Sequence, residues 1–593
     1  MVSSDFYQHK INQFQGEVDK TKITIRQYSY GRLGIALIIL SLGYLGLSNS
    51  VIFYPIPILM VLFIFFVRKQ VKVEEQQKLL LNLVKLNQLE ANSINFIFDQ
   101  FPDGTRFIDP HHSFSNDLDL FGKGSLFQYI NRCATRLGEN KLAKDLTGLN
   151  FNTEAIIQRQ EAIRELGPLS DLRQNSWATG KQIQDSEFDL KILWSWLKEP
   201  SLFYGKRSYT IIRWMLPIIT CLCLFGVLFN SVFQSIFFFM MIVQLVLCGV
   251  HSKQIVQFQL SVSVYKTILG NYSKIFQLLK EQPCSSAIMK KHCQLANEAA
   301  DSVAEFSSLA NALESRMNVM AMMFGNGLFL YDLHAVARLE KWRSDHAQSL
   351  PNWLDSLAEW DALLSFATLH FNQPSFVFGE INETLSIKGK EIGHPLIPSP
   401  QRITNNFELG NPSTLMLVTG ANMAGKSTFL RAIGVNYVLA KNGAPVCATA
   451  WSSPVASLRT GMRTSDSLQE HQSYFFAELN RLQSIIEELR SGNPMILLLD
   501  EILKGTNSTD KQAGSRELIK QLIQQKALVL LATHDIALAD MEQQYSNQIC
   551  NTCFEGKIEN DQLTFDYKLN RGVAQRANAT FLMRKMGIIP AID

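Results

Sequence analysis

One short segment of the chain has the residue types and the spacing of a phosphate-binding loop. Residues 419–428 read Thr-Gly-Ala-Asn-Met-Ala-Gly-Lys-Ser-Thr, after an apolar run that predicts a strand and before a segment that predicts a helix. Glycines let backbone N–H groups turn inward around phosphate oxygens, and the helix N-terminus adds partial positive charge. Lys426 would contact the β- and γ-phosphates of a nucleotide, and the Ser427 hydroxyl group would coordinate Mg²⁺. The candidate nucleotide-binding residues are Gly420, Ala421, Asn422, Met423, Ala424, Gly425, Lys426, Ser427 and Thr428.

Groups that could act on a bound nucleotide follow two later apolar runs. Residues 495–499 lead into Asp500 and Glu501, and residues 527–531 lead shortly into His534. If these runs are parallel strands, their carboxyl ends lie at the sheet edge where nucleotides bind. We predict that Asp500 holds Mg²⁺ through water, Glu501 polarises the attacking water and His534 senses the γ-phosphate. A lone histidine is more often a surface or core residue, but the position at a strand end favours the functional role.

These segments resemble the ATPase domain of the MutS mismatch-repair family. The likeness includes the phosphate loop, the acidic motif with its following loop at 500–510, and residues 472–479. It extends to the tail at 567–588 and upstream to 124–146 and 158–163, so that it covers about two thirds of the chain. The resemblance implies a C-terminal α/β P-loop NTPase domain of the ABC type, preceded by an α-helical core and lever region.

The family likeness also implies the cofactors, the partners and the roles of single residues. ATP and Mg²⁺ would be bound, with Lys426 and Glu501 acting in hydrolysis beside His534. The metal ligands would be Ser427 and Asp500. Ser473 occupies the position of a family serine that reaches the nucleotide of the opposite subunit, so the resemblance implies a homodimer with shared sites. DNA is a further possible partner.

Three departures from the family pattern change what we expect. Ala421 and Ala424 stand where the family usually has Pro and Gly, but the two framing glycines remain. Arg402 stands where an aromatic side chain often stacks on adenine, and an Arg plane can also stack. The family's mismatch reader carries a Phe-x-Glu triplet near its N-terminus, whereas residues 378–380 (Phe-Gly-Glu) come just before the ATPase region. We interpret this triplet as a coincidence and expect no mismatch-recognition domain.

Composition sets broader limits on the function. The 593 residues can form three or four domains, and 56 basic against 53 acidic residues give a net charge of only +3. No global basic signature for nucleic acid is therefore present. The nine cysteines show no disulfide framework, and the pair Cys550 and Cys553 favours a structural role over a zinc site.

Two long uncharged stretches, 33–67 and 214–250, predict membrane segments. A helix needs about 20 residues to cross ~30 Å of hydrocarbon, so each stretch is too long for one span and suits two short ones. Polar residues or prolines interrupt them at 48–57 and at 230–231, which predicts a helical hairpin in each. A buried pair of core helices is the alternative, but both stretches are apolar all round, unlike an amphipathic core helix.

Basic flanks indicate the orientation of these hairpins. Arg and Lys residues bracket both stretches, whereas the turns between the short helices carry no charge. By the positive-inside rule, we expect a multi-pass membrane protein with its ATPase and both termini in the cytoplasm. The polar N-terminal segment is too long to begin a cleaved signal peptide.

The expected order of domains follows from these segments. We predict an N-terminal segment with the first hairpin, a helical core, the second hairpin, a helical lever and the ATPase domain, with boundaries at 1–75, 76–205, 206–252, 253–371 and 372–593. Two functions remain open at this point. One is a membrane-anchored MutS-like ATPase that also binds DNA; the other is a dimerising ATPase that acts on membrane helices or a protein partner without mismatch recognition.

Overall fold

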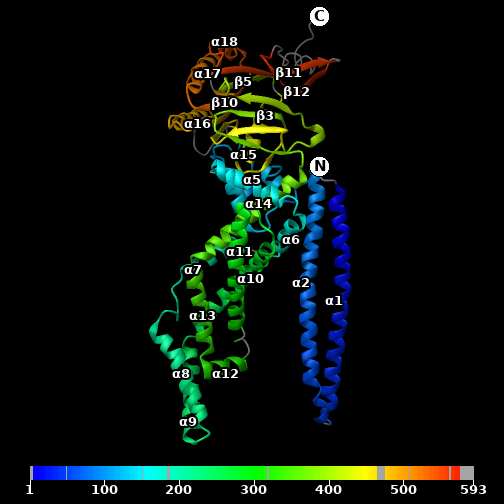
Figure 1. Cartoon of the computed structure of the whole chain (residues 1–593), viewed down its shortest axis with the longest axis vertical. Coiled ribbons are helices and arrows are strands. Elements are labelled where there is room, and N and C mark those ends of the chain that lie inside the picture. The colour runs from blue at the N-terminus through cyan, green and yellow to red at the C-terminus, as the bar shows by residue number, and fades with distance from the viewer. Residues whose placement is uncertain are drawn as a thin grey trace.

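The protein is elongated, with its α/β domain at one end and two pairs of helices extending toward the other end (Figure 1). The computed structural model describes residues 4–48, 50–149, 151–182, 187–314, 316, 319–421, 423–463, 474–504, 507–559 and 562–574. A helical body lies between the two ends and connects them (Figure 1).

The N-terminal pair consists of α1 (Ser4–Gly46) and α2 (Ile56–Ile94), which pack along each other on either side of a short turn. The turn contains a 3-10 segment, η1 (Ser50–Phe53), and Pro55 precedes the first turn of α2, where proline costs no helical hydrogen bond. The predicted hairpin is present, but its helices are not short. At 1.5 Å per residue α1 is roughly 64 Å long, about twice the thickness of a bilayer's hydrocarbon core. Charged and amide residues before 33 and after 67 are good helix formers, so the helices continue past the uncharged stretch.

Buried polar contacts hold the open end of this hairpin against the helical body. The Tyr7 hydroxyl donates to Asn372 Oδ1 at 2.6 Å, and Asn372 Nδ2 donates to Glu90 Oε2 at 2.9 Å. Glu90 also forms a buried ion pair with Arg132 at 2.5 Å. Since Asn372 ends the helix that leads into the α/β domain, the start of α1 lies at the same end of the hairpin as that domain.

The helical body is built on α14 (Ser349–Asn372), which is buried along nearly its whole length. Apolar side chains at helical spacing along 265–279 and 353–364 are buried and form packing faces of the body. The helices of the body are α3 (Leu126–Ile130), α4 (Arg136–Gly148), α5 (Thr153–Leu166), α6 (Ser170–Gly180), α7 (Glu187–Lys198), α10 (Ser252–Lys280), α11 (Ala287–Glu314), α12 (Val319–Phe329), α13 (Tyr331–His346) and α14 (Ser349–Asn372), with η2 (Thr105–Phe107) before them.

The second pair, α8 (Arg207–Gly226) and α9 (Val232–Val250), confirms a hairpin whose turn includes Asn230 and Ser231. Large apolar side chains on both helices are exposed, among them Leu222, Phe225 and Phe239. Within the part of the chain that the structure describes, four helices are long and apolar enough to cross a membrane, namely α1, α2, α8 and α9. The turns of both hairpins lie at the end of the long axis opposite the α/β domain (Figure 1).

The C-terminal domain contains a six-stranded sheet in the order β12-β11-β5-β10-β9-β8. Its strands are parallel except for β12, which pairs antiparallel with β11. The strands are β5 (Leu415–Gly420), β8 (Ser457–Gly461), β9 (Met495–Asp500), β10 (Ala527–Thr533), β11 (Ile549–Glu559) and β12 (Gln562–Arg571). The associated helices are α15 (Lys426–Lys441), α16 (Tyr474–Leu489), α17 (Ser508–Ile523) and α18 (Met541–Gln544), with the 3-10 segments η4 (Ser399–Gln401) and η5 (Ile536–Leu538).

Two smaller sheets complete this domain. A four-stranded sheet has the order β2-β7-β3-β4, and β1 pairs with β6. Their bounds are β1 (Val377–Phe378), β2 (Glu380–Asn382), β3 (Ile387–Ile392), β4 (Asn405–Leu409), β6 (Pro445–Val446) and β7 (Ala450–Pro454). The guanidinium group of Arg164 lies over the ring of Phe378, 4.3 Å from its centroid, and His370 packs against the same ring, so this triplet residue is half-buried against the core.

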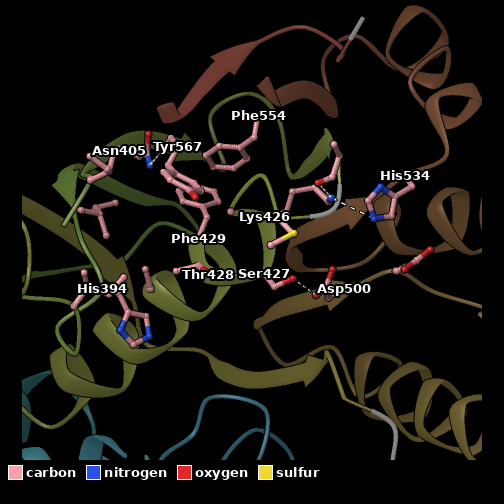
Figure 2. A pocket seen from close by; sticks show the side chains of 18 of the residues that line it. His394, Asn405, Lys426, Ser427, Thr428, Phe429, Asp500, His534, Phe554 and Tyr567 are labelled. Carbon is pink, nitrogen blue, oxygen red and sulfur yellow. Dashed lines mark hydrogen bonds between the residues drawn. The ribbon is translucent and has the colours of Figure 1, made fainter. Parts of the chain in front are cut away.

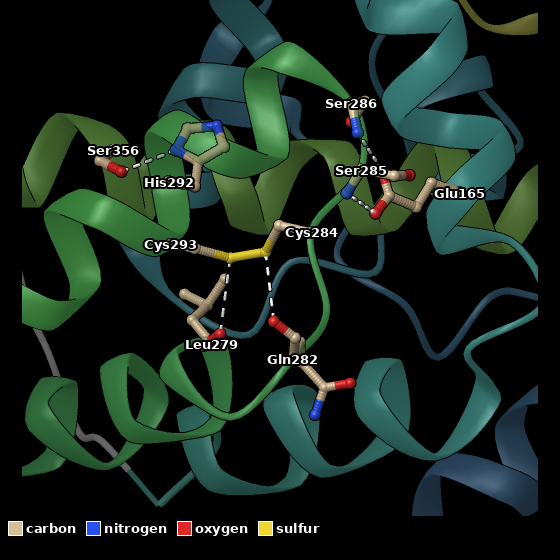
Figure 3. Close-up of a disulfide and its surroundings, with 9 residues drawn as sticks. All are labelled: Glu165, Leu279, Gln282, Cys284, Ser285, Ser286, His292, Cys293 and Ser356. Carbon is tan, nitrogen blue, oxygen red and sulfur yellow. Dashed lines mark hydrogen bonds between the residues drawn. A yellow bond between two sulfur atoms is a disulfide. The ribbon is translucent and has the colours of Figure 1, made fainter.

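One disulfide departs from our expectation for the cysteines. Cys284, in the loop before α11, is bonded to Cys293 within α11 (Figure 3). The same loop is fixed by Glu165 of α5, whose carboxylate accepts the backbone N–H groups of Ser285 and Ser286 at 2.7 and 2.9 Å. A pair separated by nine positions stabilises a local turn, which the spacing of nine scattered cysteines did not single out.

Candidate functional site

A cavity of about 570 Å³ lies at the carboxyl edge of β5, β9 and β10. The parallel register places the ends of these three strands side by side, as expected for a nucleotide site in an open α/β sheet. Figure 2 shows side chains from the loop after β5, from the ends of β9 and β10 and from β12 around this space. The sequence-predicted residues at its wall are Ala421, Met423, Gly425, Lys426, Ser427, Thr428, Asp500, Glu501 and His534.

The loop between β5 and α15 requires glycine at both framing positions. Gly420 has φ of +150°, and a Cβ atom there would lie 2.6 Å from the carbonyl oxygen of Phe554. Gly425 precedes α15 with φ of +102°, in the left-handed region that side chains disfavour. Ala424 is buried beside them, so the alanine that departs from the family pattern fits here. Asn422 lies outside the described residues.

Lys426 points back over the loop, and its ammonium group makes three close contacts. It donates to the carbonyl oxygens of Gly420 and Ala421 at 2.7 and 2.9 Å and lies 3.4 Å from Nε2 of His534. Burial lowers the pKa of Lys426 to about 8, although the charges of Asp500 and Glu501 act in the opposite direction. A cation held by two carbonyl groups and little solvent is well placed to exchange those partners for phosphate oxygens.

Ser427 and Asp500 meet at the predicted metal position. The Ser427 hydroxyl group donates to Asp500 Oδ2 at 2.5 Å, which brings the loop and the end of β9 together (Figure 2). A hydroxyl and a carboxylate oxygen are hard ligands that suit Mg²⁺, which keeps several waters and needs few protein groups. Among the described residues no group of three or more His, Cys, Asp or Glu side chains could hold a metal ion, in keeping with that small ligand set.

Glu501 follows Asp500 in a left-handed backbone conformation, with φ of +56°. Its N–H group donates to the carbonyl oxygen of Ala532 at 2.8 Å, and its carboxylate pairs with Lys511 Nζ at 3.2 Å. Burial raises the pKa of Glu501, but the hydrogen bond and charge of Lys511, with Lys504 farther away, outweigh burial and leave the pKa below its usual range. The carboxylate is therefore ionised, as a group that polarises water must be.

His534 lies just beyond β10 with its imidazole ring at the cavity wall (Figure 2). Burial and the positive charge of Lys426 lower its pKa, so the ring is neutral near pH 7. Nε2 of the ring lies 3.4 Å from the ammonium group of Lys426. This geometry brings the predicted sensor and the predicted phosphate-binding lysine together.

The opposite side of the cavity is apolar and aromatic, and sequence reasoning missed it. Tyr567 of β12 lines this side, and its backbone oxygen accepts from Asn405 Nδ2 at 3.0 Å. Arg402, our candidate for stacking on a base, is not at the wall; it donates to the carbonyl oxygen of Ile397 and lies over the ring of Phe376. In this structure the guanidinium group has its partners within the protein and not at the cavity. The remaining lining residues are Ile392, His394, Ile397, Gln401, Ile403, Asn405, Phe429, Ala432, Lys504 and Phe554.

Ser473 lies outside the described residues, but the helix that follows it is well placed. Glu478 of α16 accepts the backbone N–H groups of Leu503 and Lys504, directly after the acidic pair, at 2.6 and 3.1 Å. Arg481 of the same helix forms a 2.6 Å ion pair with the buried Asp117 of the helical body. The segment carrying Ser473 therefore leads into a helix attached both to the catalytic strand end and to the body.

Comparison with known proteins identifies this part of the chain. Residues 416–591 match the family description MutS domain V. The chain is 32% identical over 251 residues to the DNA mismatch repair protein MutS of Thermotoga maritima, covering 41% of this chain and 30% of that protein. It is 29% identical over 244 residues to MutS protein homolog 4 of Mus musculus, covering 40% of this chain and 25% of that protein. The chain thus spans about 30% or less of the length of these relatives.

Proposed function

Because this chain belongs to the MutS family through its C-terminal domain, we propose that it is an ATPase anchored to a membrane by its two apolar hairpins. The observation that carries this proposal is the joint position of Lys426, the Ser427–Asp500 pair and His534 at one cavity. Phosphate binding needs the cation and the loop, and hydrolysis needs the acidic and imidazole groups at the same edge.

The proposed chemistry assigns each side chain a separate task. Lys426 leaves the two loop carbonyl groups and binds the β- and γ-phosphates. Ser427 and Asp500 would hold Mg²⁺, which would supply positive charge against the phosphate oxygens. Glu501 exchanges its Lys511 partner for the attacking water and orients it. His534, with its neutral ring, contacts the γ-phosphate region and helps to stabilise the charge that develops there. Tyr567 offers an aromatic face for the base.

Membrane anchoring is supported by where the apolar surfaces lie. All four apolar helices are directed away from the ATPase domain, and their large side chains are exposed rather than packed in a core (Figure 1). Exposed apolar surface of this extent is characteristic of contact with lipid or with a partner. The contact of Tyr7 with Asn372 supports the placement of the N-terminus on the cytoplasmic side together with the ATPase.

Two substitutions test the ATPase with a matched control for each. Lys426→Ala in the full-length protein should weaken ATP binding, whereas Glu501→Gln should bind ATP yet lose about 10²-fold or more in turnover. Lys388→Ala and Glu517→Gln alter exposed ion pairs away from the cavity and should leave both quantities unchanged. Normal hydrolysis by Glu501→Gln would remove Glu501 from the mechanism.

A second candidate function is DNA binding, favoured by the names of the relatives, which include DNA mismatch repair protein MutS. The near-neutral net charge and the apolar hairpin α8–α9 at the end of the helical body favour instead an ATPase that moves membrane helices or a protein partner. If DNA binds, affinity should fall by roughly 0.9 log unit per phosphate contact for each tenfold rise in salt. No reader triplet is expected, so paired and mismatched duplexes should bind alike.

A titration of both duplexes at low and moderate salt decides between the two candidates. Clear preference for a mismatch would contradict the absence of a reader, and absence of binding at low salt would leave the membrane-coupled ATPase as the function.

A further inference from the structure

A fifth apolar helix, α12 (Val319–Phe329), lies outside the two predicted hairpins. No charged residue occurs between Arg316 and Asp332, but this segment is shorter than the ~17 residues that a spanning helix needs. It falls within the predicted lever region, 253–371. In the structure α12 lies at the foot of α13, at the end of the helical body far from the ATPase domain, and it also packs against α8 and α9 (Figure 1).

The two ends of this segment are joined at its base. Arg316 pairs with Asp332 at 3.2 Å, and both side chains are buried. The hydroxyl group of Tyr331 donates to the carbonyl oxygen of Ala312 at 2.7 Å. Described residues before and after α12 are thus in contact with each other at one part of the helical body.

The turn that leaves α12 is shielded by protein. Leu330 adopts a left-handed conformation and is fully buried, and the buried Asn326 side chain accepts the N–H group of Asp332 at 2.9 Å. Irregular backbone at membrane depth is tolerated only where it is buried and its polar groups are bonded, as they are here.

One face of α12 packs on α9. A Cβ atom at Gly327 would lie 2.8 Å from Cγ of Met241 and 3.7 Å from Cγ of Leu245, so the glycine permits close approach of the two helices. At 1.5 Å per residue, Met241 lies roughly 13 Å along α9 from its Val250 end. That end is near the basic flank of α8, because the hydroxyl group of Tyr209 lies 3.0 Å from Nε2 of His251, directly after α9.

Apolar side chains of α12 away from this contact are exposed. Met320, Met323, Phe324 and Phe329 are each about half exposed or more, with values of 63%, 49%, 58% and 53%. At about 3.6 residues per turn, the first three lie on the same side of α12 as Gly327 but nearer the start of the helix, beyond the contact with α9. On α9 itself Phe238, Ile242 and Val246 are also exposed. Exposed apolar side chains on two contacting helices fit a single kind of surrounding medium.

We propose that α12 is a re-entrant membrane element whose exposed face contacts lipid acyl chains. This inference rests on the proposed membrane anchoring and extends it from four apolar helices to five. Because α12 connects directly to α13 in the helical body, it provides a contact between the bilayer and the part of the molecule that leads to the ATPase. Nucleotide-driven movement of that body would shift α12 in the bilayer.

The test uses full-length protein reconstituted in phosphatidylethanolamine–phosphatidylglycerol vesicles that carry radiolabelled acyl chains. Phe324, and in a second variant Met323, is replaced by the photoreactive amino acid p-benzoylphenylalanine. Phe238 on α9 is the membrane control, and the exposed Ile536 in the ATPase domain is the solvent control. ATP turnover of each preparation shows that the protein is folded. After irradiation, both α12 positions should acquire lipid label comparable to that at Phe238 and well above that at Ile536.

Each other result contradicts the inference in a distinct way. Lipid label at Phe238 but not at either α12 position would overturn it and leave the membrane anchor intact. A cross-link from Phe324 to a second copy of the chain would assign this face to a protein interface instead. Absence of label at Phe238 as well would remove the proposed anchoring, and the inference with it.

Discussion

Lys426 is the residue whose environment in the cavity makes the most specific prediction about nucleotide binding. Burial places its pKa near 8 in the nucleotide-free protein, and phosphate charge will raise that pKa in the complex. Binding therefore takes up a proton when the pH exceeds the free-state pKa. Affinity for Mg-ATP should be nearly constant below pH 8 and should fall above it, by up to about tenfold per pH unit.

The measurement is the dissociation constant of Mg-ATP for Glu501→Gln protein between pH 7 and 9.5. The matched control is the double variant with Lys426→Arg, because arginine stays charged throughout this range and should give a weaker but flat profile. An unchanged affinity across this range in the protein that keeps Lys426 would show that this lysine does not supply the charge.

At this scale the sequence predicted the polar half of the site and missed the apolar half. Lys426, Asp500 and His534 follow strands whose apolar runs are visible in the sequence, so their meeting at one edge could be inferred. Tyr567 reaches the cavity because β12 folds back on β11, and no local sequence pattern predicts that pairing. The partners of Arg402 could not be predicted for the same reason, because the tertiary fold brings the carbonyl group that it contacts to it.

Among the elements, α16 connects the Ser473 segment to the acidic strand end. Glu478 holds the backbone two residues after Glu501, so a change at the expected dimer interface would reach the predicted water-orienting group through α16. We predict that Ser473→Ala lowers ATP turnover more than ATP affinity. In mixtures, Ser473→Ala and Lys426→Ala protein should restore about one working site per heterodimer, because each supplies what the other lacks.

Turnover measured as a function of mixing ratio checks this prediction, with each variant alone as the control. Absence of any rescue, together with a monomer of Glu501→Gln in the presence of ATP, would count against shared sites.

The lengths of the elements were harder to predict than their existence. Both hairpin turns were found because Pro55, Asn230 and Ser231 interrupt uncharged stretches. The extension of α1 to Ser4 was not predicted. A change from apolar to charged residues indicates a change in the surroundings of a helix, and it does not indicate where the helix ends. The proposed membrane contact of α12 was not predicted, because the length of this segment does not distinguish a lever helix from a re-entrant one.

For the whole molecule, the contact between Tyr7 and Asn372 argues for one topology. Reporters fused at the N-terminus, within the segment near Asp185 and at the C-terminus should all report the cytoplasm. The reason is that each hairpin returns the chain to the side from which it came. An external signal from the segment near Asp185 would require an odd number of spans before it and would contradict the hairpin arrangement.

ATP hydrolysis and membrane anchoring can be tested together in one measurement. Membranes from cells that express the full-length protein are washed with alkaline carbonate, and ATP hydrolysis is assayed in the pellet and the supernatant, with Glu501→Gln protein at equal abundance as the reference. We predict that the washed pellet hydrolyses ATP, and that this turnover is about 10²-fold or more lower with Glu501→Gln protein. Activity released into the supernatant, or equal activity of the two proteins in the pellet, would contradict it.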